Sequence, residues 1–255
     1  MRILRLANFW SATSGGQRVA LDEVGRRYAA RGHEPVLVVP GAVDDERDGP
    51  SGRIITLRGP RLRGTPYHLL TDLSRLRARF DALGPDRVEL SDRATLWPVA
   101  RWAAETGVPT VLWAHERLDA ILAPRVPRHL PLSRSTRAWN RWTLAAVGRA
   151  VAPSGFVAEE LRAAGVPDVR VVPHGVDLTV FHPGRRPPVS SRGVLLAWVG
   201  RLSKEKRPEL AVDVVAELRR RGVEARLLIV GSGTEEGRLQ QRAAGLPVTF
   251  TGQVV

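Results

Sequence analysis

The stretch Ala197-Trp-Val-Gly-Arg-Leu-Ser-Lys-Glu-Lys-Arg-Pro208 carries two cations between a predicted strand and a predicted helix. The apolar run 194–199 predicts the strand, and the final proline begins an amphipathic helical pattern. Arg201 and Lys206 therefore lie in a strand-to-helix connection, which in an open parallel sheet is the ligand-binding edge. A guanidinium fork and a flexible ammonium suit a diphosphate better than a lone carboxylate, because they can hold several oxygens from different directions. The alternative, from spacing alone, is a solvated basic loop.

Strand and helix patterns alternate along the rest of the chain, on both sides of a stretch rich in Pro, Gly, Arg and Ser. Strands are predicted at 2–6, 36–39, 53–57, 86–90, 108–114, 150–152, 169–172, 194–199 and 225–230, and helices at 17–32, 69–83, 94–106, 135–147, 155–164, 208–221 and from 235 onward. This alternation predicts parallel α/β sheets.

The Pro- and Gly-rich stretch, residues 183–192, is interpreted as a linker between two Rossmann-like domains, 1–185 and 186–255. Only three strand patterns follow Arg192, at 194–199, at 225–230 and in the stretch VTFTGQV at 248–254, fewer than the ~5 of a typical sheet. The second domain is therefore predicted to be incomplete.

The composition is that of a globular protein, with 43% hydrophobic residues in 255. The sequence has no cysteine, which excludes disulfides and thiolate chemistry and permits a reducing compartment. No apolar run approaches the ~20 residues of a membrane span, and the N-terminus begins with a strand pattern instead of a signal peptide. These features predict a cytoplasmic protein.

The formal net charge of +13 could attract nucleic acid, an anionic membrane surface or phosphorylated substrates. The basic residues are nearly all arginine and are spread along the chain without a basic-aromatic tract, which disfavours nucleic acid. Arg75 and Arg79 lie opposite the apolar positions of helix 69–83, and this pattern makes an anionic membrane surface a candidate partner. The alternative is a helix that packs on the sheet with its arginines in water.

Two further candidates follow strands of the first domain. Gly15 and Gly16 come just before a helix, where backbone N–H groups can approach an anion at the helix N-terminus; a tight turn is the alternative. His115 directly follows strand 108–114 and is therefore predicted at the same ligand-facing edge, although a lone histidine can also be structural.

Two other patterns are weaker. The stretch that begins at Gly231 resembles a dinucleotide fingerprint only loosely, because the third glycine, Gly237, comes one place late, so NAD is not predicted. The acidic stretch 41–52 is interpreted as a solvated loop in preference to a metal site. Its acidic residues are Asp44, Asp45, Glu46 and Asp48.

Several motifs, in a consistent order, resemble the retaining glycosyltransferases of family 4, which have the GT-B fold of two Rossmann-like domains. Among these, the chain looks most similar to bacterial lipid and phosphatidylinositol mannosyltransferases. The motifs are the Gly-Gly turn after the first strand, RGHE at 31–34, PHGVD at 173–177, FHP at 181–183, VGRLSKEKRPELAV at 199–212, LLIVGSGTEEGRLQ at 227–240 and VTFTGQV at 248–254.

This resemblance implies transfer of a sugar, mannose or glucose, from a GDP- or UDP-linked donor to a lipid or glycan acceptor, with retention of configuration. It implies no catalytic metal and no separate cofactor, because cations stabilise the charge that develops on the leaving diphosphate. The resemblance implies that Arg201 and Lys206 hold the donor pyrophosphate and that Gly15 and Gly16 approach it from the first domain. It also implies that His115 lies beside the transferred sugar and that Gly231 and Val254 line the nucleotide side.

The chain departs from the family pattern in two places. The glutamate pair E-x7-E, which follows the FTG segment in the family, is absent because the sequence ends at Val255. Phe9 stands where the phosphatidylinositol enzymes carry a tyrosine near the acceptor. Two other readings therefore stay open: a non-catalytic sugar-nucleotide or anion-binding fragment, and a nucleotide-sugar epimerase on the same fold.

Overall fold

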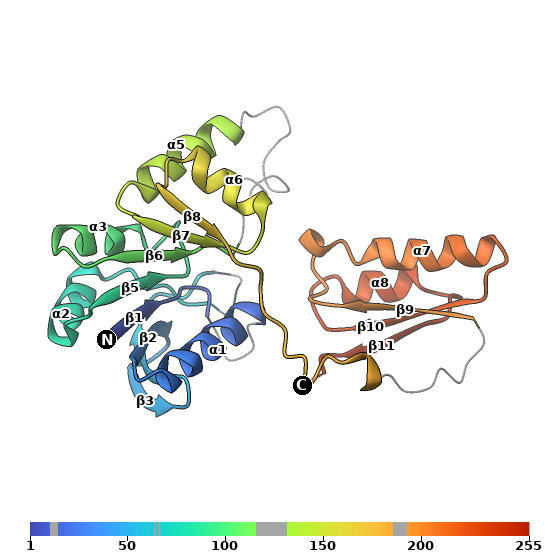
Figure 1. Cartoon of the computed structure of the whole chain (residues 1–255). Helices are drawn as coiled ribbons and strands as arrows, with labels where there is room; N and C mark the ends of the chain where they lie inside the picture. Colours follow the sequence, from blue (N-terminus) through green and yellow to red (C-terminus); the bar gives the residue numbers. More distant parts are fainter. Residues whose placement is uncertain (11–14, 64, 66, 116–131, 186–192, 255) are drawn as a thin grey trace. The chain divides into compact units, whose positions relative to one another are not determined.

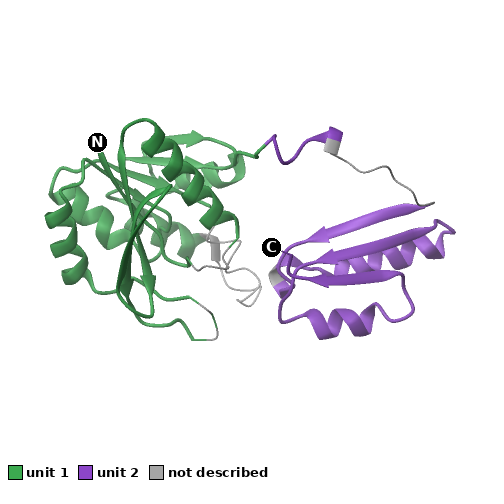
Figure 2. Cartoon of the chain, turned by 90° about the horizontal axis from the view of Figure 1, so that it is seen from below, with its two compact units in different colours: residues 1–177 green, residues 178–255 purple. Residues whose placement is uncertain are grey.

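The structure is a computed structural model that describes residues 1–10, 15–63, 65, 67–115, 132–185 and 193–254. The chain forms two compact units, Met1–Asp177 and Leu178–Val255, which are coloured separately in Figure 2. The predicted domain boundary at 185/186 lies inside the second unit. Both units have the predicted parallel α/β architecture (Figure 1).

In the part of the chain that the structure describes, unit 1 has an eight-stranded sheet in the order β3-β4-β2-β1-β5-β6-β7-β8. The strands are β1 (Arg2–Leu6), β2 (Glu34–Gly41), β3 (Asp45–Gly49), β4 (Gly52–Arg58), β5 (Arg87–Leu90), β6 (Thr110–Trp113), β7 (Arg149–Ala152) and β8 (Asp168–Val171). Neighbouring strands pair in parallel except β3 and β4. The near-continuous apolar run of β2 is buried, as expected for a parallel strand covered on both faces.

The helices of unit 1 pack on the two faces of this sheet (Figure 1). They are α1 (Gly16–Ala30), α2 (Leu73–Leu83), α3 (Trp97–Glu105), α5 (Leu132–Leu144) and α6 (Gly155–Ala163). α2 begins later than predicted because Asp72 caps it, accepting a hydrogen bond from the Arg75 backbone N–H at 3.0 Å. The helix ends at Gly84, whose φ of 55° is a left-handed conformation that suits glycine.

The prediction of a loop over the acidic stretch was wrong. Asp45–Gly49 is strand β3, paired antiparallel with β4 at the edge of the sheet. Arg53 of β4 lies 3.3 Å from Glu46 across the pair, and the Asp44 carboxylate accepts a hydrogen bond from the Arg58 backbone N–H at 2.7 Å. Charged residues are well tolerated on an edge strand, where they also discourage pairing with other chains.

A buried ion pair joins the two central strands of unit 1. Arg5 on β1 and Glu89 on β5 are register partners, 2% and 6% exposed, with Arg5 Nε donating to Glu89 Oε2 at 3.1 Å. Arg5 Nη1 also donates to the Leu21 carbonyl of α1 at 2.8 Å, and the Tyr28 hydroxyl donates to Glu89 Oε1 at 2.5 Å. Burial and the Glu89 carboxylate raise the pKa of Tyr28, so its hydroxyl stays a donor. This network fastens α1 to the sheet.

Unit 2 has a parallel three-stranded sheet in the order β11-β10-β9. Its elements are β9 (Val194–Val199), α7 (Glu209–Arg220), β10 (Ala225–Val230), α8 (Glu236–Arg242) and β11 (Val248–Gly252). The helices cover one face, over a core that includes Leu227 and Ile229. Leu195 and Val199 on β9 are 52% and 77% exposed, so the opposite face carries uncovered apolar side chains. Such a sheet, small and covered on one face, agrees with the predicted incomplete second domain.

Close backbone contact joins the connections that follow β9 and β10. Gly231 has φ 134°, and a Cβ added there would lie 2.0 Å from the carbonyl oxygen of Gly200. A Cβ on Gly233 would lie 2.2 Å from the carbonyl oxygen of Leu202. The Leu202 N–H donates to the Ser232 carbonyl at 2.9 Å. The glycines are therefore required for the two connections to meet.

We expect Gly231→Ala to lower the local stability of unit 2 by on the order of 3 kcal/mol, because alanine is both strained at that φ and blocked by a carbonyl oxygen. Gly237→Ala is the matched control, since nothing lies within 4 Å of an added Cβ there and the position is helical. It should stabilise α8 by up to about 1 kcal/mol. Hydrogen exchange of the β10 amides measures both changes, and equal protection in the two variants would contradict the prediction.

Candidate functional site

Four of the predicted site residues lie at one edge of unit 2. Arg201 comes just after β9, Gly231 directly after β10 and Val254 just after β11, and Lys206 belongs to the same connection as Arg201. Because the three strands are parallel neighbours, their carboxyl ends meet at one edge of the sheet. The structure therefore brings these four residues to the edge at which open α/β sheets bind ligands.

The connection that carries the two cations is anchored by its own backbone. Leu202 is fully buried, and its carbonyl accepts a hydrogen bond from the Glu235 N–H at 3.0 Å. The short helix η3 (Lys204–Lys206) follows, with the Lys206 N–H donating to the Ser203 carbonyl at 3.0 Å. Arg201 and Lys206 keep exposed side chains on this fixed backbone. A fixed backbone with exposed cations is a suitable arrangement for holding an anion.

Backbone strain occurs in two of the connections that hold predicted site residues. Arg207, next to Lys206, has φ 52°, and Phe9, in the β1–α1 connection, has φ 57°. Among the described residues these are the two with positive φ that are not glycine. Left-handed conformations of such residues cost energy and concentrate at functional sites. The strain is an observation, independent of the sequence motifs, that singles out these two connections.

Gly15 and Gly16 lie at the N-terminus of α1 in unit 1, as predicted. Gly15 is the N-cap residue, and no side chain caps the helix. An added Cβ at either glycine would meet nothing within 4 Å, and the φ of Gly15 is −78°. The described structure therefore gives no reason, by crowding at either position or by a left-handed backbone at Gly15, why glycine is needed there. The prediction remains that a ligand approaches the backbone at these glycines. Ser14, which precedes them, lies outside the described residues.

His115 lies near the end of β6, against the first half of α1. Its ring stacks parallel to that of His174, with ring centroids 5.8 Å apart and planes at 5°. Its Nε2 is buried and has no hydrogen-bond partner among the described residues. A cavity of about 20 Å³, lined by His115, Trp113, Ser91 and Arg5, separates the ring from α1. Such a cavity has room for about one water molecule.

Burial, and to a lesser extent the neighbouring His174, lowers the pKa of His115 to about 4. The imidazole is therefore neutral near pH 7 and carries both a donor and an acceptor nitrogen. A neutral ring offers a diphosphate no charge, whereas it can exchange hydrogen bonds with a hydroxyl. This electrostatic state suits contact with a sugar.

His174 is a residue that the sequence analysis quoted in a motif without giving it a role. It follows β8 just as His115 follows β6, so the rule that singled out His115 also applies to it. Its stacking partner could not be read from the sequence, because the two residues come from strands separated by β7.

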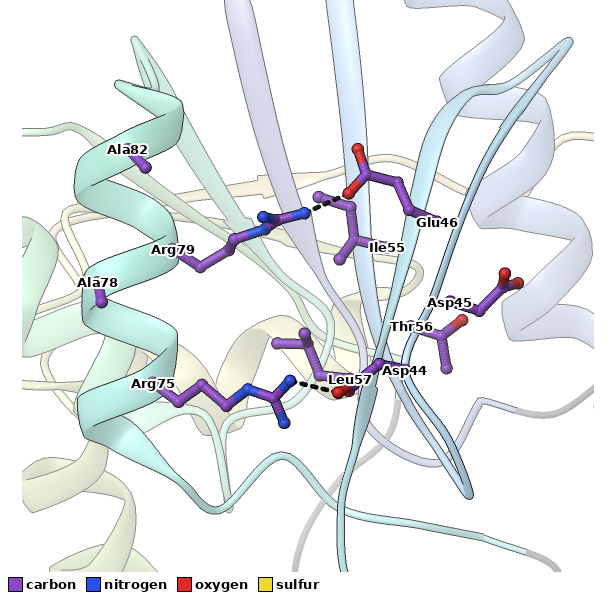
Figure 3. Close-up of a pocket in the computed structure, with 10 residues that line it drawn as sticks. All are labelled: Asp44, Asp45, Glu46, Ile55, Thr56, Leu57, Arg75, Ala78, Arg79 and Ala82. Carbon is purple, nitrogen blue, oxygen red and sulfur yellow. Dashed lines mark hydrogen bonds and ion pairs between the residues drawn. The ribbon is translucent and has the colours of Figure 1, made fainter.

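A cavity of about 560 Å³ lies elsewhere in unit 1, between α2 and the β3–β4 hairpin (Figure 3). The Arg75 guanidinium contacts the Asp44 carboxylate at 2.5 Å, and Arg79 forms an ion pair with Glu46. None of the predicted catalytic or donor-binding residues lines this cavity. The sequence predicted that the positive charges of Arg75 and Arg79 attract this helix to an anionic membrane. The two ion pairs compensate these charges and so weaken the basis of that prediction.

Among the described residues, no group of three or more His, Asp or Glu side chains is arranged to hold a metal ion. No helix in that part of the chain has both the length and the apolar character needed to cross a membrane.

Two family models match this chain, one over most of unit 1 and one over most of unit 2. Residues 14–180 match the model of Glycosyltransferase Family 4, and residues 193–255 match that of Glycosyl transferases group 1. A GDP-mannose-dependent alpha-(1-6)-phosphatidylinositol dimannoside mannosyltransferase of Mycobacterium tuberculosis is 39% identical over 259 residues, which cover 99% of this chain and 68% of that protein. A GDP-mannose-dependent alpha-mannosyltransferase of Corynebacterium glutamicum is 27% identical, over 94% of this chain and 60% of that protein.

Solved structures of glycosyltransferases share the fold. A glycosyltransferase from Rickettsia africae has a TM-score of 0.68 at 17% identity and covers 99% of this chain and 68% of its own. Sucrose-phosphate synthase from Thermosynechococcus elongatus has a TM-score of 0.66 at 18% identity and covers 99% and 70%. At such identities the likeness shows the fold alone.

The lowered pKa of His115 predicts a dependence of stability on pH. The unfolded chain takes up a proton at this histidine near pH 6.5 and the folded chain only near pH 4, so the free energy of unfolding should fall as the pH drops between these values. The loss is at most about 3 kcal/mol. Urea unfolding of the wild type and His115→Gln across this range measures it. A variant whose stability declines as steeply as that of the wild type would show that His115 titrates normally.

Proposed function

The chain belongs to glycosyltransferase family 4, and on that premise we propose that it transfers mannose from GDP-mannose to a mannosylated phosphatidylinositol lipid, with retention of configuration. The observation that supports this donor and acceptor most directly is the 39% identity, over 99% of the chain, to a GDP-mannose-dependent phosphatidylinositol dimannoside mannosyltransferase. The chain spans 68% of the length of that relative.

The donor diphosphate is assigned to the edge of unit 2. Arg201 and Lys206 bind its oxygens, and the backbone near Gly231, together with Val254, faces the nucleotide. The exposure of both cations on an anchored connection supports this assignment. As the glycosidic bond breaks, negative charge builds on the leaving diphosphate, and cations already held in place stabilise it without a metal.

Unit 1 supplies the groups around the transferred sugar. His115 hydrogen-bonds to a sugar hydroxyl, as its neutral state favours, and Gly15 and Gly16 let the N-terminus of α1 approach the donor. Retention requires no protein nucleophile in this proposal, because the acceptor hydroxyl attacks the face from which the diphosphate leaves. A lipid acceptor implies that the enzyme works at a membrane surface, and we place it on the cytoplasmic side as a peripheral protein.

Transfer of radiolabelled mannose from GDP-mannose to phosphatidylinositol mannosides tests the proposed reaction. We expect a labelled glycolipid, and we expect His115→Ala to lower kcat at least tenfold with GDP affinity nearly unchanged, because a sugar contact is lost and no phosphate contact is. Use of UDP-glucose in preference would refute the donor. Conversion of the donor without an acceptor product would indicate an epimerase, and binding without turnover a non-catalytic protein.

The diphosphate clamp has a separate test in binding alone. Arg201→Ala should weaken GDP binding about ten- to a hundredfold, since a charge-assisted bond to phosphate is worth roughly 1.5 to 3 kcal/mol. Arg201→Lys should restore only part of the affinity, because an ammonium cannot reproduce the guanidinium fork. Guanosine, which has no phosphates, should bind equally to all variants. Calorimetry measures these affinities, with the exposed Arg219→Ala on α7 as the matched control. Equal losses for GDP and guanosine would mean that Arg201 shapes the connection and does not contact phosphate.

A further inference from the structure

Helix α5 buries polar side chains beside Leu144 and exposes its two tryptophans. Its inner face buries polar residues: Asn140 is 1% exposed and Thr143 is 2% exposed. Trp139 and Trp142, its largest apolar residues, are 42% and 43% exposed. Burial of large apolar side chains is the dominant favourable term in folding, so an exposed pair of tryptophans calls for an explanation.

Hydrogen bonds explain why the polar face lies inward. Asn140 Nδ2 donates to Glu160 Oε1 of α6 at 3.0 Å, and Glu160 is paired with Arg93 at 2.8 Å. The Arg93 and Glu160 side chains are each 8% exposed. Turning α5 to bury its tryptophans would expose or unpair this network, which is costly for buried charges. The tryptophans are therefore held at the surface by the packing of α5 against α6.

The exposed tryptophans form a cluster with two residues of α3, which we call the aromatic cluster: Trp97, Arg101, Trp139 and Trp142. The ring centroids of Trp97 and Trp142 are 4.2 Å apart, and those of Trp139 and Trp142 are 5.3 Å apart. The Arg101 guanidinium lies 4.7 Å from the Trp97 ring and 4.9 Å from the Trp142 ring. This packing makes the cluster a preformed part of the surface, since its members hold one another in place.

Three exposed arginines, Arg134, Arg137 and Arg141, follow one another along the same helix at spacings of three and four residues. We call them the α5 arginines. Among the described residues no carboxylate forms an ion pair with them. They differ in this from Arg75 and Arg79 of α2, which are paired with Asp44 and Glu46. The positive charge of the α5 arginines is therefore not compensated within the described structure.

We propose that the aromatic cluster and the α5 arginines form the surface by which unit 1 docks on an anionic lipid bilayer. Tryptophan rings settle at the boundary between headgroups and acyl chains, and uncompensated arginines bind anionic headgroups. One helix that presents both kinds of side chain matches the pattern of helices that lie in a membrane interface.

A single-stranded nucleic acid is the main competing occupant, since it also combines negative charge with ring stacking. The geometry disfavours it. The rings of the cluster are tilted against one another by 47° and 53°, and Arg101 lies over two of them, so stacking surfaces are already in use. The inference goes beyond the proposed reaction and needs only a lipid surface, so its test requires neither donor nor acceptor.

Sedimentation with lipid vesicles tests the proposal on the whole 255-residue chain. Vesicles of phosphatidylcholine alone are compared with vesicles of equal parts phosphatidylcholine and phosphatidylglycerol. The wild type should bind the anionic vesicles preferentially, and Arg137→Gln with Arg141→Gln should weaken this binding roughly thirtyfold, or about fivefold for each charge. Trp139→Gln should weaken binding to the same vesicles even at high salt, where charge attraction is screened.

The matched control removes the same charge elsewhere on unit 1, by Arg31→Gln with Arg87→Gln, two exposed arginines outside the α5 surface. Circular dichroism melting verifies that each variant folds, and the arginine pair tests the proposal even where Trp139→Gln does not fold. An equal loss in the control would assign the binding to net charge and overturn the proposal. Absence of preference for anionic vesicles would overturn it as well. So would α5 variants that lose affinity for a single-stranded oligonucleotide while keeping their affinity for vesicles.

Discussion

The candidate site of unit 1 depends on the buried ion pair between Arg5 and Glu89. These two charges face each other on the central strands β1 and β5, and a buried charge that loses its partner costs several kcal/mol. The same two residues also hold α1, through the Leu21 carbonyl and the Tyr28 hydroxyl. The pair therefore sets where the helix lies on the sheet and, with it, the wall of the cavity beside His115.

Unit 2 achieves a comparable constraint without charge. There the contact is made by backbone atoms, because Gly231 and Gly233 have no side chain to keep the connection after β10 away from the connection after β9. The energy comes from backbone hydrogen bonds and from the burial of Leu202. In both units the constraint acts beside a predicted site residue: in unit 2 it fixes the backbone of the connection that carries the exposed Arg201, and in unit 1 it positions α1 beside the buried Nε2 of His115.

Two groups of arginines show how little residue type says about electrostatic role. Arg75 and Arg79 on α2 reach carboxylates of the β3–β4 hairpin, whereas the α5 arginines have no such neighbour among the described residues. Each helix carries arginines spaced three to four residues apart. The difference comes from which strand or helix the topology places opposite each helix, so that, within the described structure, the uncompensated arginine charge lies on α5 instead of α2.

The alternation of strands and helices, the division into two units, and the placement of Arg201 and Lys206 in unit 2 and of His115 in unit 1, each in a connection that follows a parallel strand, could be predicted from local pattern. Hydrophobic periodicity, glycine and proline signals, and the rule that ligands bind beyond the carboxyl ends of parallel strands each depend on residues close in sequence. The β3 strand, the stacking of His174 on His115 and the outward-facing tryptophans of α5 could not. Each of these depends on a partner that is distant in the chain: one that pairs with a charge, lowers the pKa of a histidine or accepts a hydrogen bond from a buried amide. Such a contact contributes free energy only after the fold has brought the partner into place.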